Sequence, residues 1–327
     1  MADGCAITGI GSYVPQRVLT NADLEKIVDT TDDWITSRTG IRERRMAAEN
    51  EHTSTMGIAA AQIALERAGV EAADLDLIIV ATITPDMPFP ATACIVQQEL
   101  GATKAAAFDL EAACTGFLYA LEISRQFIDN GMYQNVLVIG AEKLSSIIDW
   151  KDRNTCVLFG DGAGAAVLQS RADSRGVLAT RLGSDGGKAD ILAMPGGGCR
   201  QPATVDSVNE RIHFLKMEGK EVFKNAVNAM TGAAKEVLER SGVGIEDIKC
   251  VIPHQANQRI ISAVGERLGT RDDQVFVNLH KYGNTSAASV AVALDEAVST
   301  GIIERGDLIL IIAFGAGLTW GATVLEW

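Results

Sequence analysis

Three residues of this 327-residue chain could act together in covalent catalysis, and the first of them is Cys114. It stands where the apolar, strand-like run 105–110 gives way to a helix-like run that continues to residue 121. The unpaired N–H groups and the positive dipole end at a helix start favour a thiolate over a thiol, and the thiolate is the nucleophile. We therefore predict that Cys114 is an ionised nucleophile.

His254 and Asn284 are its predicted partners. His254 ends the apolar run 250–253 and precedes a helical pattern over 259–268, while Asn284 lies just before a helical pattern over 290–298. Strand-to-helix junctions are where α/β folds collect functional groups. Taken singly, each residue also fits a structural role, as a packed small cysteine or a turn and N-cap asparagine. Together they indicate one site. The spacing of Cys250 and His254 along a strand gives no matched chelating set, so we expect no metal.

The chain repeats itself. Residues 64–80 (ALERAGVEAADLDLIIV) align without a gap with residues 237–253 (VLERSGVGIEDIKCVIP), and each reads as a helix, a glycine turn and a strand. Such strands, apolar on both faces, are typical of sheets buried between helices. We predict an α/β protein of two similar halves, residues 1–172 with Cys114 and residues 173–327 with His254 and Asn284. Chance similarity of common α/β units is the alternative.

Composition argues against a nucleic-acid-binding protein, a membrane-spanning protein and a secreted protein. A net charge of −13 argues against nucleic-acid binding, although Arg38, Arg42, Arg44 and Arg45 form a local cluster that suits either an anion or a solvated surface. The apolar runs are too short to span a bilayer, and the first residues lack a secretory pattern. The six cysteines form no C-x-x-C pair, so we expect reduced thiols and a cytoplasmic enzyme. Residues 160–165 mimic a dinucleotide fingerprint, but a strand-like run follows where that motif needs a helix.

Several segments jointly resemble β-ketoacyl-acyl carrier protein synthase III, a family of the thiolase superfamily. They are EAACTGF at 111–117, HQAN at 254–257, GNTSAAS at 283–289 and FGAGLTWG at 314–321, with TDDWI at 31–35 and RTGIR at 38–42. The resemblance covers essentially the whole chain. It implies a thiolase-like five-layered αβαβα sandwich made from two duplicated halves, and a homodimer.

The resemblance also implies a reaction, the decarboxylative Claisen condensation of a short acyl-CoA, acetyl-CoA first, with malonyl-acyl carrier protein. The products are 3-ketoacyl-acyl carrier protein, CoA and CO₂, and the reaction initiates type II fatty-acid synthesis without a metal or redox cofactor. By position, Cys114 is the acylated nucleophile, and His254 and Asn284 support decarboxylation. Backbone N–H groups of Cys114 and Ala316 form the oxyanion hole.

Other family positions map onto this chain as binding residues. Those implied for CoA binding are Thr30, Trp34, Arg38, Arg153, Phe223 and Asn257. Those implied for the acyl pocket are Phe89, Leu144, Phe159, Leu192 and Met217, with Phe89 expected to reach into the partner subunit. Those implied for docking the acidic carrier protein are Lys224, Gln255, Ala256, Asn257, Gln258, Arg259 and Arg267. Two departures, Glu266 at a position basic in some relatives and Lys220 in place of a neutral amide, bear on carrier docking and CoA binding.

Two other enzyme functions would use the same residues. A condensing or acyl-transferring enzyme of secondary metabolism would share Cys114, His254 and Asn284. A thiol hydrolase could use the same three residues with water as its second substrate. A non-catalytic protein of this fold should have lost one of the three, and none is lost.

Overall fold

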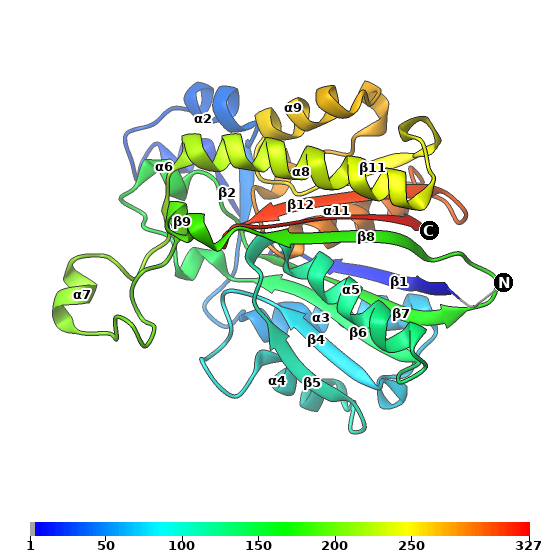
Figure 1. Ribbon diagram of the computed structural model, residues 1–327. Helices are drawn as coiled ribbons and strands as arrows, with labels where there is room; N and C mark the ends of the chain where they lie inside the picture. The colour runs from blue at the N-terminus through cyan, green and yellow to red at the C-terminus, as the bar shows by residue number, and fades with distance from the viewer. Residues whose placement is uncertain (1–3) are drawn as a thin grey trace.

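The structure is a computed structural model that describes residues 4–327, and it contains two main β-sheets with helices outside and between them (Figure 1). The first sheet belongs to the N-terminal half and has the order β1-β7-β6-β4-β5. Its strands are β1 (Gly4–Tyr13), β4 (Leu77–Ala81), β5 (Ala106–Leu110), β6 (Asn135–Glu142) and β7 (Gly162–Arg171). β4 pairs in parallel with β5 and β6, whereas β7 pairs antiparallel with β6 and β1.

The second sheet repeats this arrangement in the C-terminal half, with the order β11-β12-β13-β8. Its strands are β8 (Val177–Ser184), β11 (Cys250–Pro253), β12 (Leu308–Gly315) and β13 (Thr319–Glu326). β11 and β12 are parallel, and β13 pairs antiparallel with β12 and β8. The counterpart of β5 is reduced to one parallel bridge between Val251 and Val275. The predicted boundary between the halves, at 172/173, lies in the link from β7 to β8.

Helices form the other three layers. α3 (Thr53–Ala68) and α4 (Thr92–Leu100) cover the outer face of the first sheet, and α8 (Gly219–Ser241) and α9 (Gln258–Leu268) cover that of the second. α5 (Gly116–Asp129) and α11 (Ala288–Ser299) lie between the sheets, where one apolar cluster joins side chains of both sheets and both helices. The predicted αβαβα sandwich is confirmed.

Local sequence explains why these elements form. All five residues of β4 are buried, as expected for a strand covered on both faces. α3 and α8, the helices of the repeated segments, both end at a glycine in the left-handed region, Gly69 at φ 64° and Gly242 at φ 66°. Glycine takes this conformation without a Cβ penalty, so it stops both helices at the same place. The helix, glycine turn and strand predicted from the repeat are therefore confirmed.

Shorter elements complete the chain around these layers. The helices are α1 (Asn21–Leu24), α2 (Asp32–Thr39), α6 (Arg153–Cys156), α7 (Val205–Asn209) and α10 (Leu279–Tyr282), and the strand pairs are β2 (Arg17–Thr20) with β3 (Glu43–Met46) and β9 (Leu192–Ala193) with β10 (Lys216–Met217). The chain around α7 projects from the body of the molecule, at the left of Figure 1. At the base of this projecting segment, Asp149 forms ion pairs with Arg211 and Lys216.

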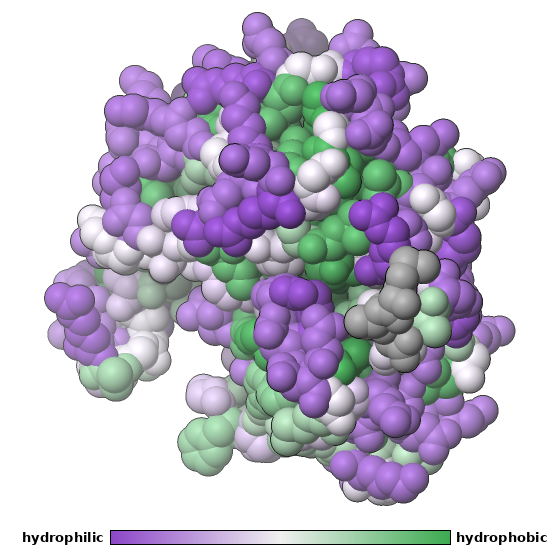
Figure 2. All heavy atoms as spheres, turned by 45° about the vertical axis from the view of Figure 1, so that its right-hand side comes forward, coloured by the Kyte–Doolittle hydropathy of each residue, from purple (hydrophilic) through white to green (hydrophobic). Residues whose placement is uncertain are grey.

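Hydrophilic residues cover most of the face shown in Figure 2, and hydrophobic residues reach that face in a band down its middle. Within residues 4–327, no helix is both long and apolar enough to cross a membrane.

Candidate active site

Cys114 lies on a sharp turn between β5 and α5. The turn contains a 3₁₀ helix, η2 (Ala113–Thr115), and Ala113 has a positive φ of 46°, which is uncommon for a residue with a Cβ. The C-terminal half holds this turn in place. Thr115 Oγ1 donates to Thr319 Oγ1 at 2.7 Å, and Gly315 packs so closely that a Cβ there would lie 2.7 Å from the Cys114 nitrogen. The two halves therefore meet at the thiol.

Cys114 is buried, and burial decides its protonation. Loss of solvent raises the pKa of the thiol to about 12; Ser286 and a backbone N–H act in the lowering direction, and the charge of Glu142 raises it further. Burial therefore raises the pKa of the thiol by more than the start of the helix lowers it. The prediction that the resting residue is a thiolate is therefore wrong for the unliganded chain, where Cys114 is a thiol.

His254 follows β11, and its backbone N–H donates to the carbonyl of Ile312 on β12 at 2.7 Å. The ring is buried, and its Nδ1 lies 2.5 Å from the hydroxyl oxygen of Ser289 in the first turn of α11. Burial lowers the pKa of His254 to about 4, because the charged imidazolium would lose its hydration. His254 is therefore neutral near pH 7, with a proton on only one ring nitrogen.

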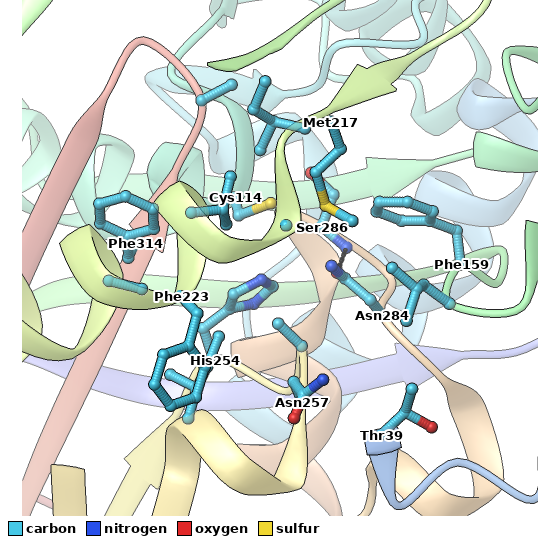
Figure 3. A pocket seen from close by; sticks show the side chains of 18 of the residues that line it. Thr39, Cys114, Phe159, Met217, Phe223, His254, Asn257, Asn284, Ser286 and Phe314 are labelled. Atoms are coloured by element: carbon cyan, nitrogen blue, oxygen red, sulfur yellow. Dashed lines mark hydrogen bonds between the residues drawn. The ribbon is translucent and has the colours of Figure 1, made fainter. Parts of the chain in front are cut away.

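Asn284 is held by backbone bonds on both sides. Its N–H donates to the Leu158 carbonyl at 2.8 Å, and its carbonyl accepts from Gly160 at 3.0 Å. Its side-chain oxygen accepts from the backbone N–H of Ser286 at 2.8 Å. Because the oxygen is engaged, the amide presents its Nδ2 hydrogens as donors to the cavity. In Figure 3 the Cys114 sulfur, the His254 ring and the Asn284 amide converge on one space.

That space is a cavity of about 810 Å³ lined by residues of both halves, and Cys114, His254, Asn284 and Ala316 all contribute to its wall. The structure thus brings together residues that are far apart in the sequence, as we predicted. The wall around them is mostly apolar, so few groups compete with the three polar side chains for a bound substrate. The arrangement combines a sulfur atom with two hydrogen-bonding groups, and all three residues are buried in the wall of the cavity.

The mouth of the cavity is aromatic and cationic. The guanidinium groups of Arg38 and Arg153 lie 4.6 and 5.1 Å from the ring centre of Trp34, and that of Arg259 lies 5.7 Å from the ring centre of Phe223. Such a surface suits a ligand with a flat base and phosphates. Of the residues expected to bind CoA, Trp34, Arg38, Phe223 and Asn257 line the cavity, whereas Thr30 and Arg153 do not.

The predicted acyl-pocket residues divide in the same way. Leu144, Phe159, Leu192 and Met217 line the cavity. Phe89 does not, and this residue is 84% exposed. Cavity-lining residues that the sequence analysis did not identify include Thr39, Ile83, Asn154, Leu215, Met230, Ser286 and Phe314. Thr39, Ser286 and Phe314 stand inside segments that carry the family resemblance, whereas the others come from separate segments that no local pattern marks.

The residues expected to dock the carrier protein are only partly at the surface. Lys224 on α8 and Arg259 and Arg267 on α9 are exposed, and Ala256, Asn257 and Gln258 are partly exposed. Gln255 is buried, with its amide oxygen accepting from Asn278 and Leu279 and its nitrogen donating to the carbonyls of Pro253 and Phe276. The prediction that Gln255 contacts a docked protein is therefore wrong, because its side chain fastens the segment that leads to Asn284.

The arginine cluster is also only partly available to an anion. Arg44 is fully buried, and its guanidinium donates to the carbonyls of Leu19 and Val157 and to the side chain of Asn21. Burial lowers the pKa of this arginine to about 10. Neither sequence-based interpretation of Arg44, an anion ligand or a solvated surface charge, is correct.

Glu142, at the end of β6, is a buried carboxyl group that the sequence analysis missed. It accepts hydrogen bonds from the hydroxyls of Thr82 and Thr84 and from the backbone N–H of Ile83. Burial raises the pKa of Glu142 to about 7, against the lowering effect of these bonds. No local signal distinguishes it, because it ends an apolar run and precedes a lysine, as many surface glutamates do. In residues 4–327 no group of three His, Cys, Asp or Glu side chains is arranged to hold a metal ion.

Comparisons with known proteins agree with this geometry. Residues 108–186 match the family described as 3-oxoacyl-[acyl-carrier-protein] synthase III, and residues 238–327 match its C-terminal part. The chain is 59% identical over 321 residues to a β-ketoacyl-[acyl-carrier-protein] synthase III of Caldanaerobacter subterraneus subsp. tengcongensis, covering 98% of this chain and 97% of that protein.

Solved structures show the same likeness. The 3-oxoacyl-[acyl-carrier-protein] synthase III of Aquifex aeolicus VF5 superposes with a TM-score of 0.93 at 52% identity, covering 99% of this chain and 100% of that one. The priming β-ketosynthase of the R1128 polyketide biosynthetic pathway superposes with a TM-score of 0.92 at 39% identity, covering 99% and 96%.

Proposed function

This chain belongs to the β-ketoacyl-[acyl-carrier-protein] synthase III family, and we propose that it condenses a short acyl-CoA, acetyl-CoA first, with malonyl-acyl carrier protein. The products are 3-ketoacyl-acyl carrier protein, CoA and CO₂, and the reaction starts type II fatty-acid synthesis. The observation that carries the proposal is the shared cavity of Cys114, His254 and Asn284, whose mouth presents Trp34 and Arg38.

The first half-reaction transfers the acyl group to Cys114. The sulfur attacks the thioester carbonyl, the bond from that carbonyl to the CoA sulfur breaks, and the thiol proton ends on the released CoA. Because Cys114 is a thiol at rest, its proton leaves as the new bond forms. Backbone N–H groups of Cys114 and Ala316, both in the cavity wall, are the proposed donors to the tetrahedral oxyanion.

The second half-reaction uses His254 and Asn284. Loss of CO₂ from the malonyl carboxylate develops negative charge on the malonyl thioester oxygen, and the carbon left behind then attacks the acyl carbonyl on Cys114. The bond from that carbonyl to the Cys114 sulfur breaks, and the released sulfur takes up a proton from solvent to return to the thiol. Asn284 offers Nδ2 hydrogens and neutral His254 can offer a ring N–H, so both can donate to that oxygen without a formal charge. Donors fixed in advance, away from bulk water, stabilise such charge more in the transition state than in the ground state. The chemistry needs no cofactor besides the CoA thioester.

The basic residues beside the cavity support docking of an acidic carrier protein. Lys224, Arg259 and Arg267 lie on the adjacent helices α8 and α9 near the mouth, and Lys220 lines the mouth itself. Glu266 is exposed among them and weakens the positive field. This local patch offsets the net charge of −13 where the phosphopantetheine arm of the carrier would enter.

A homodimer is part of the proposal. β5 pairs only with β4 among the described strands, so its outer edge offers unpaired backbone groups. Phe89 and Met87 are exposed in the segment that leads to α4, the helix packed on β5. A second copy joined at β5 would cover this edge and bring Phe89 to the partner's cavity. Sedimentation velocity should therefore give a dimer, and a monomer would remove this part of the proposal.

Six free cysteines, four of them buried, are what a reducing compartment maintains, and this supports a cytoplasmic location.

The test follows both half-reactions. Intact-protein mass spectrometry after separate incubation with acetyl-, isobutyryl- and octanoyl-CoA should show an acyl adduct with the short chains, and Cys114→Ala should show none. Added malonyl-acyl carrier protein should discharge the adduct to 3-ketoacyl-acyl carrier protein. Release of free acid would indicate a hydrolase. A preferred adduct other than acetyl, or discharge to a different acceptor, would favour the secondary-metabolism alternative.

A further inference from the structure

The two groups proposed to donate to the substrate oxygen are oriented by different means. The Asn284 amide accepts a hydrogen bond from the backbone N–H of Ser286, so the backbone conformation sets its orientation. The His254 ring is fixed by a side chain, because its Nδ1 lies 2.5 Å from the Ser289 hydroxyl oxygen. Only the second arrangement can be removed by one substitution.

The Ser289 hydroxyl makes no other hydrogen bond to any residue in the range 4–327. It is 1% exposed, so water does not supply a partner readily. If Nδ1 carried the proton and donated to Ser289, the hydroxyl hydrogen would be left buried without an acceptor, which costs about 1–3 kcal/mol. If Ser289 donates to Nδ1 instead, both groups are satisfied.

The direction of this bond determines whether the Nε2 atom of His254 carries a hydrogen that it can donate to the substrate. A neutral imidazole carries one proton, so a ring that accepts at Nδ1 must bear its hydrogen on Nε2. The Nε2–H can then donate to the negative oxygen that forms during decarboxylation. The other tautomer would place a lone pair there and repel the same oxygen.

We propose that Ser289 is a positioning residue that donates its hydroxyl hydrogen to Nδ1 of His254 and so holds the ring as the Nε2–H tautomer. The inference rests on the proposed function for its catalytic consequence, but its structural content does not depend on activity. Ser289 acts on the decarboxylation step alone, because acyl transfer to Cys114 makes no use of a donor at His254.

The direct test is the ¹⁵N spectrum of protein labelled at histidine, with the His254 signals assigned by their absence in His254→Asn. The wild-type chain should show a protonated Nε2 and an unprotonated Nδ1 for His254. A protonated Nδ1 would overturn the proposal. This measurement needs no substrate, so it stands even if condensation fails with every acyl-CoA tried.

The kinetic test separates the two half-reactions. Ser289→Ala should lower malonyl decarboxylation about tenfold, the loss expected for one hydrogen bond, and leave the rate of Cys114 acylation within about twofold. Ser289→Thr, which keeps the hydroxyl, should recover most of the loss. The matched control is Ser124→Ala, since Ser124 is equally buried but its hydroxyl donates to the Ala120 carbonyl of its own helix.

Equal losses in both half-reactions of Ser289→Ala, or the same selective loss in Ser124→Ala, would show that Ser289 acts only through packing. If Ser289→Ala does not fold, the wild-type ¹⁵N spectrum still decides the tautomer.

Discussion

The two halves of the molecule share one strand arrangement but carry different chemistry at matching positions. β4 and β11 correspond, and the chain after β4 carries Thr82 and Thr84 where the chain after β11 carries His254. β6 and β12 correspond, and the first ends in Glu142 where the second ends in Gly315. The shared sheet order brings these ends to the same region, and the residue at each end determines its role.

The central helices extend the comparison. α5 is preceded by Cys114 and α11 by Asn284, and each approach contains a residue with a positive φ, Ala113 at 46° and Ser286 at 48°. Strained backbone of this kind costs about 1–3 kcal/mol and tends to occur at functional sites. In the proposed mechanism, the N-terminal half supplies the nucleophile and the C-terminal half supplies the donors. Under this proposal, the two halves of a duplicated scaffold serve two consecutive half-reactions.

The substitution Asn284→Ala has the largest expected effect, and it tests whether the two halves serve different half-reactions. We expect malonyl decarboxylation to fall on the order of 100-fold or more, as for the loss of one oxyanion donor, while acylation of Cys114 stays within about twofold. Stopped-flow release of CoA and ¹⁴CO₂ release measure the two steps separately. Asn130→Ala, at the exposed end of α5, is the control and should change neither step. Equal losses in both steps of Asn284→Ala would contradict the division.

Gly140→Ala tests the contact between the halves. A Cβ at Gly140 on β6 would lie 2.4 Å from the carbonyl oxygen of Ala287, at the start of α11. Backbone must shift to relieve this overlap, so we expect a loss of about 1–3 kcal/mol in the free energy of unfolding. Urea denaturation followed by circular dichroism measures it. An unchanged midpoint would show that the halves are not packed this closely.

Glu142→Gln tests a charge in the N-terminal half that has no counterpart at Gly315. Burial sets the raised pKa of the Cys114 thiol, and the Glu142 carboxylate raises it further. The pKa of Glu142 is about 7, so its negative charge is present above that pH and absent well below it. Removing the charge should speed iodoacetamide alkylation of Cys114 several-fold at pH 8, because thiolate is the reactive form. The variant and the wild type should react alike at pH 5.5.

Peptide mass spectrometry is needed for this measurement, because Cys94 and Cys199 are exposed and also react. Glu99→Gln, an exposed carboxylate on α4, is the control and should leave the alkylation of Cys114 unchanged. Slower alkylation in Glu142→Gln would show that the hydrogen-bonding role of Glu142 exceeds that of its charge.

The smallest expected effect is that of Gly232→Ala, which complements Gly140→Ala. Gly232 lies inside α8 on the outer layer, and a Cβ there would meet no atom of residues 4–327 within 4 Å. Alanine reduces the conformational freedom of the unfolded chain, so we expect a gain of about 0.4–1 kcal/mol in the free energy of unfolding. The same urea titration gives the value. A loss at Gly232 as large as that at Gly140 would mean that closeness to the other half is not the cause of either effect.

Much of the fold followed from local sequence. The apolar run at β4 and the glycines at Gly69 and Gly242 predicted the repeated helix, turn and strand, because strand burial and helix termination depend on neighbouring residues. Cys114, His254 and Asn284 could be named for a related reason. Each stands at a strand-to-helix junction, and such junctions can be recognised without knowing what packs on them.

The errors concern burial by distant residues. Gln255 was expected at the surface but is enclosed by Phe276, Asn278 and Leu279. Arg44 was expected to meet an anion or solvent but is surrounded by segments near residues 19 and 157. The positions of Ser289 and Glu142 beside the catalytic residues could not be predicted either, because nothing in their local sequence indicates which side chain they approach.

The amino-acid sequence by itself determined which residues are candidates for the reacting groups, the duplicated order of elements and the turns that end them. Tertiary structure alone decided that Cys114 is a buried thiol, that His254 is neutral and that Ser289 faces its Nδ1. The physical reason is the range of the interactions. Hydrogen bonds within a turn and the periodicity of a strand act over a few residues, whereas protonation depends on how far solvent is excluded, which segments distant in sequence decide together.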